Sequence, residues 1–136
     1  MILKVLFVCI ENSCRSQMAE ALGIVHGAGV IDAYSAGSRP SGVVNEKAIA
    51  AMIDSGYDLT SHKSKSLDAV PQIEFDYVIT MGCGDECPYV RAKNREDWKI
   101  PDPKHMEMEE FIAVRNTIKE KVMQLIEEIK VSNSTL

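Results

Sequence analysis

The stretch that decides the fold is "VLFVCIENSCRSQMAEA", residues 5–21, in which an apolar run passes through a short turn into a helical pattern. Residues 2–8 are almost entirely apolar, which predicts a buried central strand of a parallel sheet. Residues 16–28 carry apolar side chains at helical spacing and predict a helix. The turn between these two elements contains Cys9 and Arg15, so a thiol and a guanidinium share one strand-to-helix junction.

Outward from this stretch, the chain continues to alternate strands with helices. The sequence predicts further strands at residues 30–35, 75–81 and 98–100, helices at 45–55 and 107–131, and a short helix after residues 60–67. The last helix carries a stripe of six apolar residues, three or four positions apart, as core packing requires: Phe111, Val114, Ile118, Val122, Leu125 and Ile129. This alternation predicts one α/β domain, residues 1–136, with a four-stranded parallel sheet and helices on both faces.

Composition and charge exclude several classes of protein. The chain has 136 residues and a formal net charge of -5, which gives it no general attraction to nucleic acid or to an anionic membrane. Its N-terminal apolar run is too short to span a bilayer and is followed by no small-residue cleavage site. We therefore expect a cytoplasmic monomer with no membrane partner. Four cysteines in that compartment favour catalysis or metal binding over structural disulfides.

The junction after the first strand predicts an oxyanion site. A strand, a turn and a helix N-terminus leave several backbone N–H groups without internal partners, and such a ring of donors binds anions. Arg15 adds a planar fork that can hold two oxygens, and the same positive field favours the thiolate of Cys9. Ser16 can donate a hydrogen bond to that thiolate, and Asn12 can brace the loop. The residues expected to surround the anion are Ile10, Glu11, Asn12, Ser13, Cys14, Arg15 and Ser16.

The segment "FVCIENSCRSQMAEA" resembles the phosphate-binding loop of the low-molecular-weight protein tyrosine phosphatase family, and "NSCRSQMAE" resembles the arsenate reductases built on that fold. The later segments "YSAGS", "FDYVITM", "CGDECP" and "DP" extend the resemblance along nearly the whole chain. The resemblance implies a four-stranded parallel sheet flanked by helices. It also implies that Cys9 is the nucleophile, Arg15 the oxyanion clamp and Asp102 the general acid.

Two further cysteines favour a reductase over a phosphatase. Cys83 and Cys87 follow the third predicted strand, at the same edge of the sheet as Cys9, and residues four apart can close a disulfide. We expect one of them, preferably Cys83, to attack Cys9 and the other to resolve the bond. Thioredoxin or another thiol donor would then reduce the Cys83–Cys87 disulfide. The thioredoxin-coupled members place six residues between these cysteines, whereas this chain has three.

Three alternatives stay open. The first is a phosphatase that hydrolyses phosphate monoesters through a phosphorylated Cys9, although "DPKHMEM" lacks the aromatic residues that usually grip the substrate ring in the family's tyrosine phosphatases. The second is an oxyanion sensor without turnover. The third is a zinc site made by the four cysteines, which the adjacent cation of Arg15 disfavours. We therefore expect no metal and no cofactor, and we expect Cys14 to be a packed loop residue.

Several polar residues depart from the family pattern. Glu11 stands where glycine is common, and its carboxylate must point away from the anion, toward a basic side chain. Some members bind potassium behind the loop; Glu20 and Ser35 match that site, but lysines occupy the other two positions, Lys63 and Lys65. A lysine ammonium could replace the cation, so no potassium requirement is expected. The three histidines show no ligand spacing and are expected at the surface or at helix ends.

Overall fold

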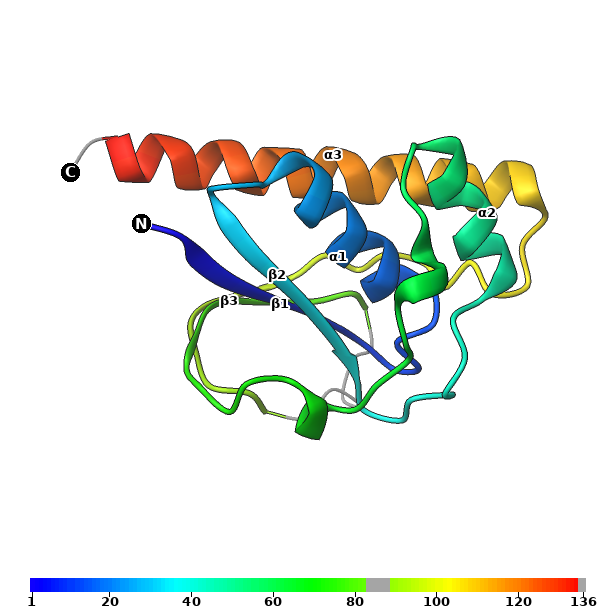
Figure 1. Cartoon of the computed structure of the whole chain (residues 1–136), viewed down its shortest axis with the longest axis horizontal. Helices are drawn as coiled ribbons and strands as arrows, with labels where there is room; N and C mark the ends of the chain where they lie inside the picture. The colour runs from blue at the N-terminus through cyan, green and yellow to red at the C-terminus, as the bar shows by residue number, and fades with distance from the viewer. Residues whose placement is uncertain (83–88, 135–136) are drawn as a thin grey trace.

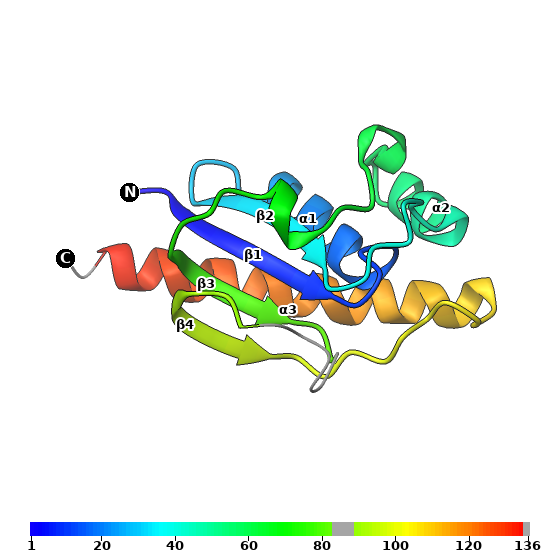
Figure 2. The same cartoon turned by 90° about the horizontal axis from the view of Figure 1, so that it is seen from below.

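Four parallel strands form one sheet in the order β2-β1-β3-β4 (Figures 1 and 2). The computed structural model describes residues 1–82 and 89–134. The strands are β1 (Leu3–Cys9), β2 (Ile31–Gly37), β3 (Phe75–Thr80) and β4 (Ala92–Asp97). The predicted parallel sheet is confirmed. β1 pairs with β2 on one side and with β3 on the other, so the end of β1 lies at the centre of the carboxyl edge.

Both faces of β1 are buried from Val5 to Cys9, as its almost entirely apolar sequence predicts. Val5 and Phe7 belong to a large core shared with the α-helices, whereas Leu6 and Val8 belong to a smaller core on the opposite face. In the described part of the chain, three α-helices complete the fold: α1 (Arg15–His26), α2 (Glu46–Asp54) and α3 (Met108–Ser134). Figure 2 shows α1 and α3 behind the sheet, with α2 beyond the ends of the strands.

The opposite face carries a different kind of cover from the one predicted. The 3-10 helix η2 (Leu67–Ala69) and the chain on either side of it lie over that face, and they enclose the smaller core. Another 3-10 helix, η1 (Leu59–Ser61), follows α2. The short helix expected after residues 60–67 is η2. Helical turns therefore cover both faces, but the long α-helices α1 and α3 share one face.

The long C-terminal helix packs as its periodicity predicts. All six residues of its apolar stripe are buried in the larger core. The helix packs beside α1 on the same face of the sheet and runs the length of the molecule in Figure 1. Its remaining surface is mostly polar or charged, although Met123 and Val131 are exposed. No helix within residues 1–82 and 89–134 is long and apolar enough to cross a membrane.

The prediction for the fourth strand is wrong. The strand β4 comprises Ala92–Asp97, "AKNRED", and the predicted segment 98–100 follows it. An edge strand is held by its backbone ladder with one neighbour, here β3, so its side chains need no apolar pattern. The apolar residues that suggested a strand pack inward instead: Trp98 is buried against Phe7, with ring centroids 5.8 Å apart.

Candidate active site

Cys9 is the last residue of β1, and its thiol lies under the loop that leads into α1. We call residues 10–14 the oxyanion loop. The sulfur atom Sγ lies 2.8 Å from the hydroxyl of Ser16 and accepts a hydrogen bond from the backbone N–H of Asn12 at 3.2 Å. Both contacts are buried, and Cys9 itself is 2 % exposed. The expected contact between Ser16 and the sulfur is present, and a backbone donor reaches the same atom.

The carbonyl groups show which way the oxyanion loop faces. The five successive carbonyl oxygens of residues 9–13 accept hydrogen bonds from groups outside the loop. A trans peptide is planar, with its N–H opposite its C=O, so the amide hydrogens of residues 10–14 point inward. The donors to the carbonyls are the backbone N–H groups of Ser38, Arg39, Ser41 and Asn45 and the side chains of Ser64 and Gln17. The predicted ring of anion-binding donors follows from this arrangement.

Two positions make this tight loop possible. Asn12 has a φ of 51°, in the left-handed region that asparagine tolerates better than most residues. Gly37, at the end of β2, touches the loop so closely that a Cβ there would lie 2.5 Å from the carbonyl oxygen of Ile10. A side chain at Gly37 would therefore push the loop away from the sheet.

Two backbone carbonyl groups from distant parts of the chain hold the guanidinium of Arg15 in place. Its Nη1 donates hydrogen bonds to the carbonyl oxygens of Met81, at 2.8 Å, and of Ile100, at 3.1 Å. Its Nη2 lies 3.9 Å from Oδ2 of Asp102, and the residue is 5 % exposed. The guanidinium is therefore pre-organised at the edge of the site, where it can bind oxygens of an anion without reordering a flexible side chain.

A cavity of about 180 Å³ brings most of the predicted residues together. Its lining is Cys9, Ile10, Glu11, Ser13, Cys14, Arg15, Arg39, Asp102 and Lys104. Asp102 lies between Pro101 and Pro103, and its carboxylate accepts a hydrogen bond from the backbone N–H of Lys104 at 3.1 Å. Its side chain is about half exposed, which suits the general acid that the family resemblance implies. Asn12 and Ser16 support the site from behind.

Cys14 and Glu11 both line the cavity but differ in environment. Burial raises the pKa of the Cys14 thiol to about 12, with the charge of Asp102 adding to the effect, so Cys14 stays a neutral thiol. Both carboxylate oxygens of Glu11 accept hydrogen bonds from Nζ of Lys104, at 3.0 and 2.9 Å. The pKa of Lys104 is raised by that partner. The expectation that Glu11 turns toward a basic side chain is confirmed.

The sequence did not predict a hydrogen-bond network that lies behind the oxyanion loop. Asn12 donates to the hydroxyl of Ser16 at 2.8 Å and accepts from Gln17 at 2.9 Å, and Gln17 contacts Nδ1 of His62 at 3.0 Å. The Nε2 of His62 lies 2.6 Å from the hydroxyl of Tyr57. His62 is the C-cap of η1, one of the two positions expected for it, and its side chain is only 9 % exposed. Because Gln17 and His62 are 45 positions apart, no local sequence pattern indicates their contact.

The ammonium of Lys65 lies beside Glu20 and Ser35, the two residues that match the family's potassium site in sequence. Nζ of Lys65 lies 3.4 Å from Oε1 of Glu20 and 3.3 Å from the hydroxyl of Ser35, which itself donates to Glu20. The ammonium thus contacts two of the oxygens that would hold a cation. Within residues 1–82 and 89–134, no group of three or more His, Cys, Asp or Glu side chains is placed to hold a metal ion.

The second pair of predicted catalytic cysteines, Cys83 and Cys87, lies outside the described residues. The chain that leads to them is described. Met81 is buried and its carbonyl contacts Arg15, and Gly82 has a φ of 92° with its N–H bonded to Asp97 at 3.0 Å. Cys83 is the next residue in the sequence.

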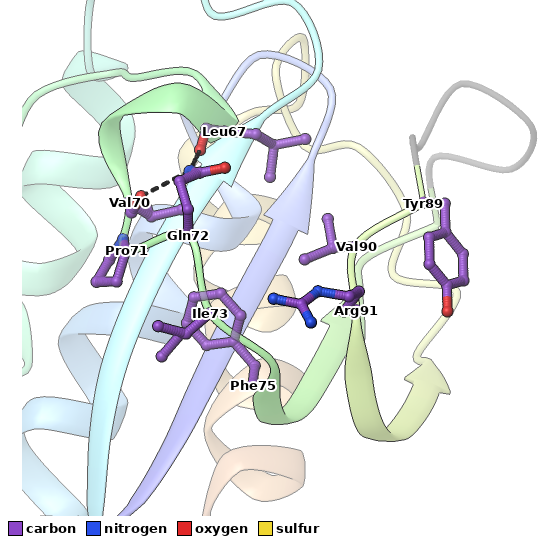
Figure 3. Close-up of a pocket in the computed structure, with 9 residues that line it drawn as sticks. All are labelled: Leu67, Val70, Pro71, Gln72, Ile73, Phe75, Tyr89, Val90 and Arg91. Atoms are coloured by element: carbon purple, nitrogen blue, oxygen red, sulfur yellow. Dashed lines mark hydrogen bonds between the residues drawn. The ribbon is translucent and has the colours of Figure 1, made fainter.

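A separate cavity of about 240 Å³ lies on the face of the sheet that does not carry α1 and α3, beside η2 (Figure 3). Leu67, Val70, Ile73, Phe75 and Val90 give it an apolar lining, and Gln72 bonds to the carbonyls of Leu67 and Val70 at 2.9 and 2.8 Å. None of the predicted catalytic residues lines it.

The fold and the oxyanion site define a family. Residues 4–135 match the family described as "Low molecular weight phosphotyrosine protein phosphatase", and this chain belongs to that family. Among its relatives, a protein named "Glutaredoxin arsenate reductase", from Synechocystis sp., is 40% identical over 129 residues, which cover 93% of this chain and 98% of the relative. A protein named "Arsenate reductase", from Staphylococcus aureus, is 41% identical over 118 residues, covering 83% and 88% of the two chains.

Solved structures agree with this placement. The chain is similar to "An arsenate reductase in the phosphate binding state", with a TM-score of 0.85 at 40% identity, covering 93% of this chain and 98% of the other. It is also similar to an arginine phosphatase from Geobacillus stearothermophilus, with a TM-score of 0.82 at 22% identity, covering 98% and 96%. The second likeness shows the shared fold alone.

Proposed function

We propose that the protein reduces arsenate to arsenite through a cysteine relay that begins at Cys9. The observation that carries this proposal is the position of the Cys9 sulfur, beneath inward-facing amide hydrogens and in one cavity with Arg15 and Asp102. Arsenate is a tetrahedral oxyanion, so the ring of donors and the guanidinium suit its oxygens. The two further cysteines in the sequence supply the electrons that a hydrolase does not need.

In the first step, the Cys9 thiolate attacks arsenic. An arsenic–sulfur bond forms, an arsenic–oxygen bond breaks, and Asp102 gives its proton to the departing oxygen, which leaves as water. The inward amide hydrogens and Arg15 stabilise the charge on the remaining oxygens. Arsenic does not change oxidation state in this step.

In the second step, a thiolate from Cys83 or Cys87 attacks the Cys9 sulfur. A disulfide forms, the sulfur–arsenic bond breaks with its electron pair remaining on arsenic, and arsenite is released. The remaining cysteine then attacks the mixed disulfide, which frees Cys9 and leaves a Cys83–Cys87 disulfide. We favour Cys83 as the first attacker. Thioredoxin or another thiol donor returns the two electrons.

The comparisons support reduction over hydrolysis. The relatives with 40% and 41% identity are named arsenate reductases. Lys104 and His105 follow Pro103, at positions where aromatic residues would hold the ring of a phosphotyrosine. Hydrolysis of phosphate monoesters through a phosphorylated Cys9 is the alternative, since nucleophile, clamp and acid serve both reactions. We also propose that the protein acts as a monomer in the cytoplasm, where thiol reductants are kept reduced.

A single-turnover experiment tests the relay. Reduced protein is mixed with arsenate, and arsenite release, loss of free thiols and disulfide position by peptide mapping are measured together. We expect loss of two thiols and a disulfide between Cys83 and Cys87. The Cys14→Ser variant is the matched control and should still lose two thiols to the Cys83–Cys87 disulfide, because Cys14 is a buried neutral thiol that the relay does not use. Arsenite release at the wild-type rate by the Cys83→Ser, Cys87→Ser double variant would refute the relay.

A further inference from the structure

The ion pair between Glu11 and Lys104 stands at the mouth of the oxyanion cavity. Nζ of Lys104 lies 3.0 and 2.9 Å from the two carboxylate oxygens of Glu11. The two residues are 93 positions apart, so the contact joins the oxyanion loop to the segment that carries Asp102. Side-chain exposures of 40% and 37% place the pair at the surface, where a substrate must pass.

The pair also forms a boundary between two hollows. On one side lies the oxyanion cavity of about 180 Å³, and on the other a larger hollow of about 450 Å³. Glu11, Ser13 and Lys104 line both of them. The larger hollow has an apolar wall, because Val43 and Val44 line it and Val43 is 67% exposed.

The position of Asp102 explains why this boundary is important for substrate choice. A general acid protonates the oxygen that leaves, and in a phosphate monoester that oxygen carries the organic group. The organic group must therefore extend past Asp102, whose carboxylate accepts a hydrogen bond from the backbone N–H of Lys104. The departing oxygen of arsenate carries no substituent and needs no such space.

We propose that the Glu11–Lys104 ion pair is a specificity-determining barrier that disfavours oxyanions with an organic substituent. This inference rests on the proposed function, since it explains why a site with phosphatase machinery serves a free oxyanion. While the pair is closed, an aryl group cannot reach the apolar wall at Val43. The two charges cancel, so the barrier excludes by shape and leaves the net charge of the mouth unchanged.

The test removes the barrier without changing the net charge. The Glu11→Ala, Lys104→Ala double variant is compared with wild type for hydrolysis of para-nitrophenyl phosphate and for inhibition by inorganic phosphate. An exposed ion pair opens at a cost equivalent to a factor of about two to five. We therefore expect kcat/KM for the aryl ester, relative to affinity for inorganic phosphate, to rise by about two- to fivefold.

Two further variants keep the experiment interpretable. The Lys4→Ala, Asp32→Ala variant removes another exposed ion pair, 3.3 Å long and outside the cavity, and should leave the ratio at the wild-type value. The charge-swapped Glu11→Lys, Lys104→Glu variant rebuilds the barrier and should return the ratio toward that of wild type. An unchanged ratio in the alanine double variant, or an equal rise in the Lys4 control, overturns the proposal. Arsenite release by wild type is measured in parallel, so failure of the proposed function is seen separately.

Discussion

Replacing Ser16 by alanine should make Cys9 a poorer nucleophile. The Ser16 hydroxyl lies 2.8 Å from the Cys9 sulfur, in a site where Ser16 is fully buried, so water cannot take its place. The backbone N–H of Asn12, at 3.2 Å, remains as a donor to the sulfur. The variant therefore removes one donor from the thiolate and keeps the other.

The magnitude follows from that geometry. A hydrogen bond to a charged group is worth about 1.5–3 kcal/mol, and roughly half of that loss is offset because a less stabilised thiolate is intrinsically more nucleophilic. The rate of alkylation by iodoacetamide at a fixed pH should therefore fall about three- to tenfold.

The assay follows alkylation of Cys9 by mass spectrometry, in a background where Cys83 and Cys87 are serine. Cys14 does not interfere, because burial raises its pKa to about 12. The control is Ser38→Ala, which removes a buried hydroxyl that makes no hydrogen bond within the described part of the chain. Alkylation of the Ser16 variant at the wild-type rate, with the Ser38 control also unchanged, would refute the reasoning.

Three other predictions follow from the site. Asp102→Asn should lower kcat for arsenite release by about 10²- to 10⁴-fold, because the leaving oxygen loses its proton donor; a loss below about tenfold, with the rate of the chemical step measured in single turnover, contradicts that role. Arsenite release should be equal in potassium and sodium buffers of matched ionic strength, because the Lys65 ammonium already contacts Glu20 and Ser35 at 3.4 and 3.3 Å; a rate that rises with potassium contradicts it. Burial lowers the pKa of His62 from 6.5, although the charge of Glu20 opposes this shift. As pH falls, the unfolded chain therefore binds the proton before the folded protein does, and the free energy of unfolding decreases as pH falls through and below 6.5. The urea midpoint of His62→Gln should therefore change less than that of wild type between about pH 7.5 and about pH 5.5, and equal changes in both proteins contradict the assignment.

Local sequence determined the parts of the molecule that depend on neighbours along the chain. The apolar run of β1, the turn and the start of α1 place a cysteine and an arginine at one strand-to-helix junction, whatever the rest of the fold does. The stripe of α3 is likewise periodic, and its burial follows from helical geometry alone. The family resemblance added Asp102, whose position between two prolines would otherwise read as an ordinary turn.

Tertiary structure alone decided the contacts between distant segments. The edge strand β4 has no apolar signal, because its ladder to β3 uses backbone groups that every residue carries. The bond from Gln17 to His62 joins residues 45 positions apart, and the Glu11–Lys104 pair joins residues 93 positions apart. Such pairs form because the parallel sheet brings the carboxyl ends of its strands to one edge, where loops from all parts of the chain meet. The sequence therefore determined which groups are candidates for the chemistry, whereas the sheet order decided which groups orient, neutralise and enclose them.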